Sequence, residues 1–166
     1  AKKNKVKRIV YASSIYSMSV LGGFYRCSKK AAEDYIEEYY KRYGLNFTVI
    51  RYGSLYGLRT DRSNGVYRVI DDAIKNNRIQ YFGHRNSLRR YIHVVDAAKA
   101  TVDTISSKFK NKYVNIVGPK LYKVTDLFNI VSKSLKIASK VRCLNLNTMG
   151  HYVKSPKLFR LIIGEW

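Results

Sequence analysis

The sequence predicts an α/β protein, with an incomplete doubly wound parallel sheet followed by a small α/β lobe. Within residues 7–52, a buried strand, an amphipathic helix and a second buried strand follow one another. This order requires a crossover helix, which favours a parallel sheet with helices on its faces. Shorter strands and helices alternate after Gly57. A hydrophobic fraction of 46% over 166 residues is enough for a packed core.

The first strand is expected at residues 7–12 (KRIVYA) and ends in a pair of serines. A helix is expected from about residue 28 to 43, because small, aliphatic and tyrosine residues recur at helical spacing on one face. The other face carries the acidic residues Glu33, Asp34, Glu37 and Glu38. Gly44 stands where a helix C-cap glycine belongs, and residues 46–52 (NFTVIRY) form the second strand.

The elements beyond Gly57 are shorter. Helices are expected at residues 64–77, 95–107 and 126–136, and strands at residues 79–82, 113–117 and 141–146. Thr125 is a candidate cap for the last helix. The chain is therefore divided into residues 1–57, the second half of a doubly wound domain, residues 58–156, the lobe, and an unassigned tail at residues 157–166.

The net charge is +21, from 32 Lys and Arg against 11 Asp and Glu. A nucleic acid or another polyanion is one partner that such a charge favours. The alternative is a lysine-rich fragment whose acidic remainder lies elsewhere. The basic residues are spread along the chain and no nucleic-acid-binding motif is present, so we favour the second interpretation, and a nucleic-acid partner stays open.

Several classes of protein are excluded or disfavoured. No apolar stretch reaches the length of a membrane span, and the basic N-terminus is followed by too short an apolar run for a secretory signal. Cys27 and Cys143 have no metal-ligand spacing, so no metal site is expected. These features fit a reducing compartment, and a cytoplasmic location is expected.

Tyr25 and Lys29 stand four residues apart at the head of the helix, which places both side chains on one face. A phenol with an unperturbed pKa of about 10 is a poor base at neutral pH. A neighbouring ammonium favours the phenolate and makes proton exchange with a substrate hydroxyl feasible. Such a pair also arises by chance in a chain rich in tyrosine and lysine, where it marks only an amphipathic helix.

The segments around this pair resemble extended short-chain dehydrogenases of the NAD-dependent nucleotide-sugar epimerase/dehydratase family. Four segments occur in order: YASS at 11–14, the Tyr-x-x-x-Lys helix, IRYG at 50–53 and LRRYIHVVDAA at 88–98. Residues 149–152 (MGHY) also resemble the tail of one sugar-epimerase subgroup. The resemblance extends to about residue 156. It is specific for the superfamily and not for a substrate.

The resemblance implies a Rossmann-like first domain and a role for each matching residue. Tyr25 would be the general acid/base, Lys29 would bind the nicotinamide ribose and hold Tyr25 near its phenolate, and Ser14 would hydrogen-bond the same substrate oxygen. Tyr25 and Tyr52, together with Lys29, would bind the cofactor. Arg89 would bind the substrate diphosphate.

Three further residues in the matching segments have other interpretations. Asn64 is either a second diphosphate contact or a helix N-cap, and the two are equally favoured. Asp96 is interpreted as a helix cap, and His93 as a structural residue without a catalytic role.

The sequence also departs from the family. No G-x-x-G-x-x-G occurs in the 166 residues, so the cofactor, NAD or NADP, would depend on an N-terminal half that this sequence lacks. The interval from Ser14 to Tyr25 is short, which predicts a trimmed substrate loop. Ile15 and Tyr16 stand where sugar 4,6-dehydratases carry an Asp-Glu pair, which favours an epimerase or a reductase.

The leading hypothesis is therefore the substrate-side portion of an NAD(P)-dependent nucleotide-sugar epimerase or reductase, inactive as an isolated chain. By analogy with the family, a homodimer through the Tyr25 helix is expected. One alternative is a non-catalytic basic protein of the same fold that binds RNA or another polyanion. The other is a truncated, inactive gene product.

Overall fold

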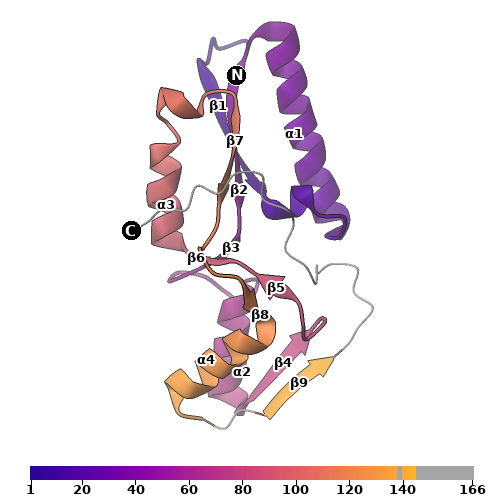
Figure 1. The fold of residues 1–166 in the computed structure, drawn as a ribbon, viewed down its shortest axis with the longest axis vertical. Helices are drawn as coiled ribbons and strands as arrows, with labels where there is room; N and C mark the ends of the chain where they lie inside the picture. The colour runs from indigo at the N-terminus through magenta and orange to yellow at the C-terminus, as the bar shows by residue number, and fades with distance from the viewer. Residues whose placement is uncertain (138–139, 145–166) are drawn as a thin grey trace.

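A computed structural model describes residues 1–137 and 140–144 of the chain. The upper part is a three-stranded parallel sheet, in which β2 (Asn46–Tyr52) pairs with both β1 (Arg8–Ser14) and β7 (Lys112–Ile116). The helix α1 (Gly23–Tyr43) lies on one side of this sheet and α3 (Val94–Asp103) on the other (Figure 1). The predicted parallel sheet with helices on both faces is confirmed.

The alternation of side chains along β2 explains the two helical layers. Phe47 points toward α1, where its ring contacts the Tyr40 ring edge-on, with the ring centres 5.7 Å apart. Ile50 points the other way and belongs to a buried cluster with Ala97 of α3. Strands buried on both faces need this continuous apolar character, which is the signal that the sequence carries.

The chain leaves the sheet after β2, builds the first part of the lobe, returns to the sheet through α3 and β7, and then completes the lobe. Residues 58–156 are therefore not one packing unit, because α3 and β7 pack with β2 in the first sheet. The boundary predicted near Gly57 misses this return. Periodicity identifies a strand but does not identify its partner.

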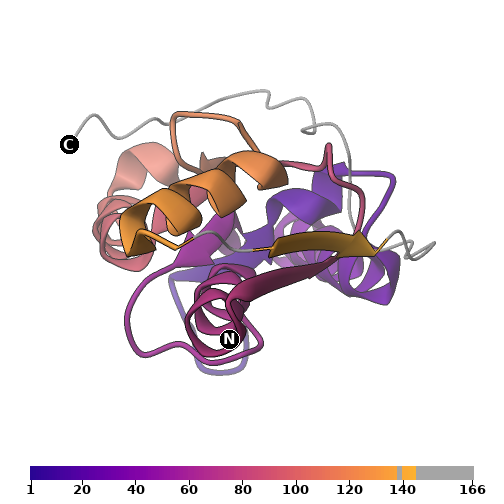
Figure 2. The ribbon, with the colours of Figure 1, turned by 90° about the horizontal axis from the view of Figure 1, so that it is seen from below.

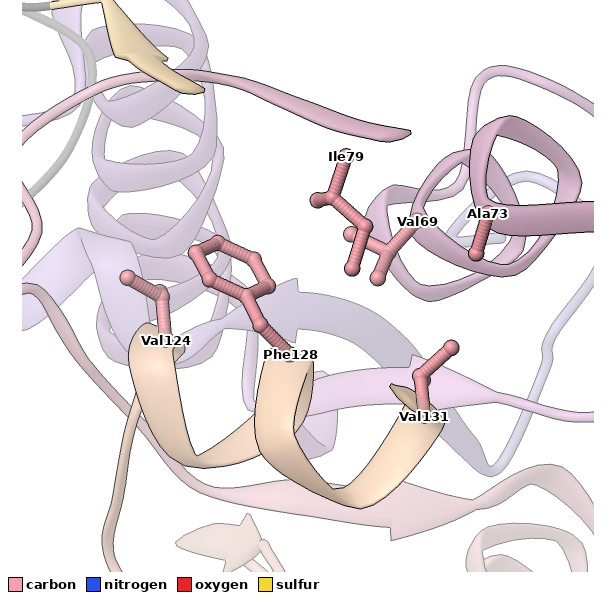
Figure 3. Close-up of a cluster of buried hydrophobic side chains, with 6 residues drawn as sticks. All are labelled: Val69, Ala73, Ile79, Val124, Phe128 and Val131. Atoms are coloured by element: carbon pink, nitrogen blue, oxygen red, sulfur yellow. The ribbon is translucent and has the colours of Figure 1, made fainter. Parts of the chain in front are cut away.

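The lobe contains α2 (Gly65–Asn76), α4 (Val124–Leu135) and a parallel pair of strands, β4 (Arg78–Phe82) and β9 (Lys140–Leu144). Seen from below, α2 and α4 lie beside the β4–β9 pair (Figure 2). The helices and β4 enclose an apolar core (Figure 3). Its buried members are Val69, Ala73, Ile79, Val124, Phe128 and Val131.

Short elements join the two parts. β3 (Ser54–Tyr56) pairs in parallel with β6 (Tyr91–His93), and β5 (Leu88–Arg89) pairs antiparallel with β8 (Tyr122–Lys123). Two single-turn 3₁₀ helices, η1 (Ile15–Met18) and η2 (Ser107–Phe109), follow β1 and α3. None of these was predicted, because elements this short show no periodicity.

Several helix ends differ from the prediction. α1 begins at Gly23, about one turn earlier than expected, and ends at Tyr43; the φ of 66° at Gly44 confirms the predicted C-cap. α4 begins at Val124, with the Asp126 carboxylate accepting a hydrogen bond from the Lys123 backbone N–H at 2.8 Å. Thr125 therefore lies inside the first turn and is not the cap.

The cap of α3 is also corrected. The His93 ring nitrogen Nδ1 accepts a hydrogen bond from the Val95 N–H at 3.3 Å, so His93 caps this helix and Asp96 lies in its first turn. The structural role expected for His93 is confirmed. An imidazole nitrogen serves here in place of the usual carboxylate or hydroxyl oxygen.

The two faces of α1 are not divided as the sequence pattern indicated. Glu33, assigned to the polar face, is fully buried, with 0% exposure, whereas Tyr35 on the expected apolar face is 72% exposed. The reason is that the sheet beneath α1 is polar at its carboxyl end, where Arg51 and Ser13 bind the Glu33 carboxylate.

Among the described residues, no helix is long and apolar enough to cross a membrane. No group of three or more His, Cys, Asp or Glu side chains in the described ranges is arranged to hold a metal ion. The MGHY segment at 149–152, the end of the strand expected at 141–146, and the tail at 157–166 lie outside the described residues.

Candidate active site

All six residues predicted as site residues line one cavity of about 880 Å³. The cavity lies between the sheet and the lobe, at the carboxyl ends of β1 and β2 and beside the first turns of α1. Open parallel sheets bind their ligands at this edge. The six residues are Ser14, Tyr25, Lys29, Tyr52, Asn64 and Arg89.

Tyr25 and Lys29 are presented on the same side of α1, as their spacing predicted. The Lys29 ammonium donates a hydrogen bond to the Ala12 carbonyl at 2.9 Å and lies 5.8 Å from the centre of the Tyr25 ring. Two of its three N–H groups remain able to donate to other acceptors. The Tyr25 side chain is 53% exposed, and its ring borders the cavity.

Ser14 is the last residue of β1 and is almost completely buried. Its Oγ caps η1 by accepting a hydrogen bond from the Tyr16 N–H at 3.2 Å. The hydroxyl is therefore oriented by the first turn after the strand, and its own proton can be donated toward the cavity. This geometry suits a hydrogen bond to a substrate oxygen.

Tyr16 is a residue of the site that sequence reasoning did not assign. Its ring packs edge-on against Tyr25, with the ring centres 6.0 Å apart and the planes at 84°. Burial raises the pKa of Tyr16, and the positive charge of Arg89 opposes part of that rise. The short interval between Ser14 and Tyr25 could have indicated this, because η1 lies within it and turns Tyr16 toward Tyr25.

Arg89 is the buried cation of the cavity, with 6% exposure. It lies on β5, and its Nη1 donates a hydrogen bond to the Leu88 carbonyl at 2.9 Å. A guanidinium in this setting offers planar, paired donors of the kind that phosphate oxygens bind.

Asn64 is the N-cap of α2, which confirms one of its two interpretations. Its Oδ1 accepts hydrogen bonds from the Val66 and Tyr67 N–H groups at 3.0 and 3.2 Å, and its Nδ2 donates to the Leu55 carbonyl at 2.8 Å. A primary amide has two N–H donors, so one remains for a ligand. The same residue therefore holds the helix and borders the cavity.

Tyr52 ends β2, and its hydroxyl is 2.6 Å from the Thr101 hydroxyl of α3. This contact turns the phenol toward the face covered by α3, although the residue still borders the cavity. Tyr52 is thus linked to the sheet's other helical layer, opposite Tyr25 and Lys29.

A second cavity, of about 520 Å³, lies among α2, α3, α4 and the segment after β7. Its lining is mostly aliphatic and aromatic, and none of the six predicted site residues contributes to it. The six predicted site residues are therefore gathered in the first cavity.

The profile of the NAD dependent epimerase/dehydratase family matches residues 1–117. A candidate UDP-glucose 4-epimerase of Methanocaldococcus jannaschii is 35% identical over 114 residues, which are 67% of this chain and 37% of that protein. The chain thus spans less than two fifths of that relative's length.

Solved structures of similar fold span about twice the length of this chain. A UDP-glucuronic acid 4-epimerase from Bacillus cereus, in complex with UDP-glucuronic acid and NAD, superposes with a TM-score of 0.83 at 18% identity over 92% of this chain and 52% of that chain. A dTDP-glucose 4,6-dehydratase from Streptomyces venezuelae, bound to NAD, gives a TM-score of 0.81 at 18% identity over 90% and 51% of the two chains. These likenesses extend the agreement in fold beyond residue 117. The matched profile, the relative above 30% identity and the shared fold agree that this chain belongs to the NAD dependent epimerase/dehydratase family.

Proposed function

We propose that this chain forms the substrate side and the acid–base centre of a nucleotide-sugar epimerase. The observation that supports this most strongly is the convergence of Tyr25, Lys29, Ser14 and Arg89 on one cavity at the carboxyl edge of the sheet. These residues come from three separate elements, and the fold alone brings them together. They combine a proton-transfer group, a hydroxyl donor and a phosphate-binding cation.

The charges around the cavity suit a diphosphate. Its lining includes four basic residues, Lys29, Arg62, Arg68 and Arg89, against one acidic residue, Asp72. Arg62 is held on α2 by an ion pair with Asp72 at 2.9 Å and by another with Asp71. Arg89 is buried at the lobe side, so a diphosphate bound there would place the attached sugar toward Ser14 and Tyr25.

The acid–base step follows from the positions of three side chains. The Tyr25 side chain, in its ionised form, would accept the proton of a sugar hydroxyl while the carbon that bears this hydroxyl is oxidised to a carbonyl, and would return the proton afterwards. The Ser14 hydroxyl would donate a hydrogen bond to the same oxygen, and the Lys29 ammonium would favour the ionised phenol. Each of these roles uses a group that lines the cavity.

The residues present also suit one end of an NAD molecule. The Lys29 ammonium has N–H groups beyond the one bonded to Ala12, and such donors match the hydroxyls of a ribose. Bound NAD supplies a hydride acceptor and donor, which makes the reaction at the sugar carbon reversible. The chain itself carries no glycine-rich pyrophosphate turn, so we propose that it shows no turnover alone.

Binding of UDP-glucose to the purified chain tests this proposal. Titration calorimetry at low salt should detect saturable 1:1 binding, and Arg89→Lys should weaken it about tenfold, because a bidentate contact to phosphate becomes a single one. Arg85→Lys is the matched control, since Arg85 is an exposed arginine that does not line this cavity. It should leave the affinity unchanged.

Two results would count against the proposal. Equal weakening by Arg85→Lys and Arg89→Lys would indicate nonspecific attraction by the charge of +21. A preference for heparin or RNA over UDP-glucose, with affinity falling steeply as salt rises, would favour the polyanion-binding alternative. If the chain binds none of these ligands, the result would favour the interpretation as a truncated, inactive gene product.

A homodimer through α1 forms part of the proposal. Phe24 and Tyr35 on the outer side of this helix are 95% and 72% exposed, and large apolar side chains gathered on one helix face are typical of interfaces. Light scattering should give a dimer for the wild type and a monomer for Tyr35→Glu. A monomeric wild type would contradict this part of the proposal.

A further inference from the structure

The helix that carries Tyr25 and Lys29 is attached to the sheet through a buried charge. Glu33 is the only residue of α1 in the fully buried class. Its Oε1 accepts hydrogen bonds from Ser13 Oγ at 2.5 Å and from Arg51 Nε at 3.0 Å, and its Oε2 accepts one from Arg51 Nη2 at 2.6 Å. A carboxylate with both oxygens bound in this way has a fixed position and direction.

A second polar contact one turn further along α1 extends this attachment to the third strand. The Tyr113 hydroxyl of β7 donates a hydrogen bond to the Glu37 carboxylate at 2.5 Å. The Arg51 guanidinium lies over the Tyr113 ring, 4.4 Å from its centre. Through Ser13, Arg51 and Tyr113, α1 is therefore bound to β1, β2 and β7.

The partners of Glu33 adjoin the predicted site residues. Ser13 directly precedes Ser14, and Arg51, its register partner across the sheet, directly precedes Tyr52. On α1, Glu33 follows Lys29 by one turn and Tyr25 by two, on the same side of the helix. The same carboxylate thus links the strand that ends in Ser14 with the helix that begins near Tyr25.

Apolar packing holds this end of α1 only weakly. Tyr25 is 53% exposed, and its ring stands at 84° to the Tyr16 ring, with the ring centres 6.0 Å apart. Arg26 binds the Ser19 carbonyl in the loop before the helix, and Lys29 binds the Ala12 carbonyl. Arg26 joins α1 to the loop before it and Lys29 joins it to β1 alone, whereas Glu33 joins it to both β1 and β2.

We infer that Glu33 is a positioning residue, which through Arg51 and Ser13 fixes Tyr25 and Lys29 relative to Ser14. A helix transmits such a constraint because its residues are rigidly spaced, with a rise of about 1.5 Å each. The geometric part of this inference stands on the contacts of Glu33. Its consequence for the sugar rests on the proposed function.

Proton NMR of the chain with labelled tyrosine tests the geometric part. The Tyr16 ring, 6.0 Å from the Tyr25 ring and at 84° to it, should shift the ring-proton signals of Tyr25, which Tyr25→Phe identifies by their loss. Glu33→Gln should move these signals, because the neutral amide no longer holds the Arg51 guanidinium. Asp34→Asn is the matched control: it removes one carboxylate from the exposed side of the same helix, where Asp34 pairs with Lys30 at 2.6 Å.

Ser13→Ala gives a second version of the test, since it keeps both charges and removes only one hydrogen bond. It should shift the Tyr25 signals in the same direction as Glu33→Gln but less, and it tests the inference by itself if Glu33→Gln fails to fold. If the Tyr25 signals of every folded variant, Ser13→Ala included, coincide with those of Asp34→Asn, the inference is overturned.

Ligand binding tests the consequence for the sugar. In Glu33→Gln the affinity for UDP should be retained, while the preference for UDP-glucose over UDP is lost, because the sugar lies on the Tyr25 side. Equal weakening of both ligands would show a merely structural role and overturn the inference. If the wild type binds neither ligand, the proposed function fails, and the Tyr25 signals still decide the role of Glu33.

Discussion

The interface beneath α1 and the core of the lobe are built by opposite means. In the lobe, α2, α4 and β4 meet through aliphatic side chains and Phe128, all of them buried. Beneath α1, the fully buried helical residue is Glu33, and the tyrosines of the helix lie largely outside. Apolar packing tolerates small displacements, whereas hydrogen bonds to a carboxylate fix a direction. The rigidly oriented helix is the one that carries Tyr25 and Lys29.

The largest effect is expected in the lobe. Phe128→Ala should lower the free energy of unfolding by about 4 kcal/mol, because it leaves a cavity beside Ile79 and Val124. Denaturant unfolding measures this loss, and Ile130→Ala on the same helix, where Ile130 is 48% exposed, serves as the control. A loss below about 1 kcal/mol for Phe128→Ala would show that apolar packing does not hold the lobe.

A slightly smaller loss is expected beneath α1. Arg51→Met should lower the free energy of unfolding by about 3 kcal/mol, because it leaves the Glu33 carboxylate buried without its cation. The double variant Glu33→Met/Arg51→Met should recover most of this loss. Additive losses in the double variant would contradict a stabilising buried ion pair, and the contrast between the interface beneath α1 and the core of the lobe would then disappear.

The loop that presents Tyr16 should be less sensitive. Gly22 has a φ of 133°, and an added Cβ would lie 2.8 Å from the Arg26 Cβ and 3.0 Å from the Tyr16 ring. Gly22→Ala should therefore cost about 1–2 kcal/mol of stability and displace the Tyr16 signals in NMR spectra. Gly65→Ala, where the nearest atom to an added Cβ is Arg68 Nη2 at 4.0 Å, is the control. Equal losses of stability in Gly22→Ala and Gly65→Ala would contradict the idea that the conformation at Gly22 positions Tyr16.

The pH dependence of stability separates the two regions further. Burial alone would raise the pKa of Glu33, but hydrogen bonds from Arg51, Ser13 and Ser17 and the Arg51 charge outweigh it and lower the pKa. The stabilisation is therefore present above the unfolded pKa of about 4.3 and is lost as the pH falls through the folded value. The stability difference between wild type and Glu33→Gln should shrink in acid. A difference that is constant with pH would contradict this.

The smallest effect is expected at the surface of α1. Asp34→Asn removes the exposed ion pair with Lys30 and should change the stability by less than about 0.5 kcal/mol. Thermal unfolding at low and high salt measures it. A change as large as that of Arg51→Met would mean that charge at any position on α1 holds the helix.

The sequence predicted the parallel strands, the Tyr-x-x-x-Lys helix and the residues of one cavity, because each depends on local periodicity or on a matching motif. It did not predict that β7 returns to the first sheet, since strand pairing is not a local property. The burial of Glu33 was missed for a related reason. Helical periodicity sorts residues by polarity, but Arg51 and Ser13 make the polar side of α1 the buried one.

Mapping of amide and tyrosine signals during a titration with UDP-glucose tests whether the cavity at the carboxyl edge of the sheet binds a nucleotide sugar. Saturable shifts are expected at Ser14, Tyr25, Asn64 and Arg89, on both sides of the cavity of about 880 Å³. Shifts confined to the other cavity, beside His93 and Ile130, or spread evenly over the basic surface, would contradict this expectation.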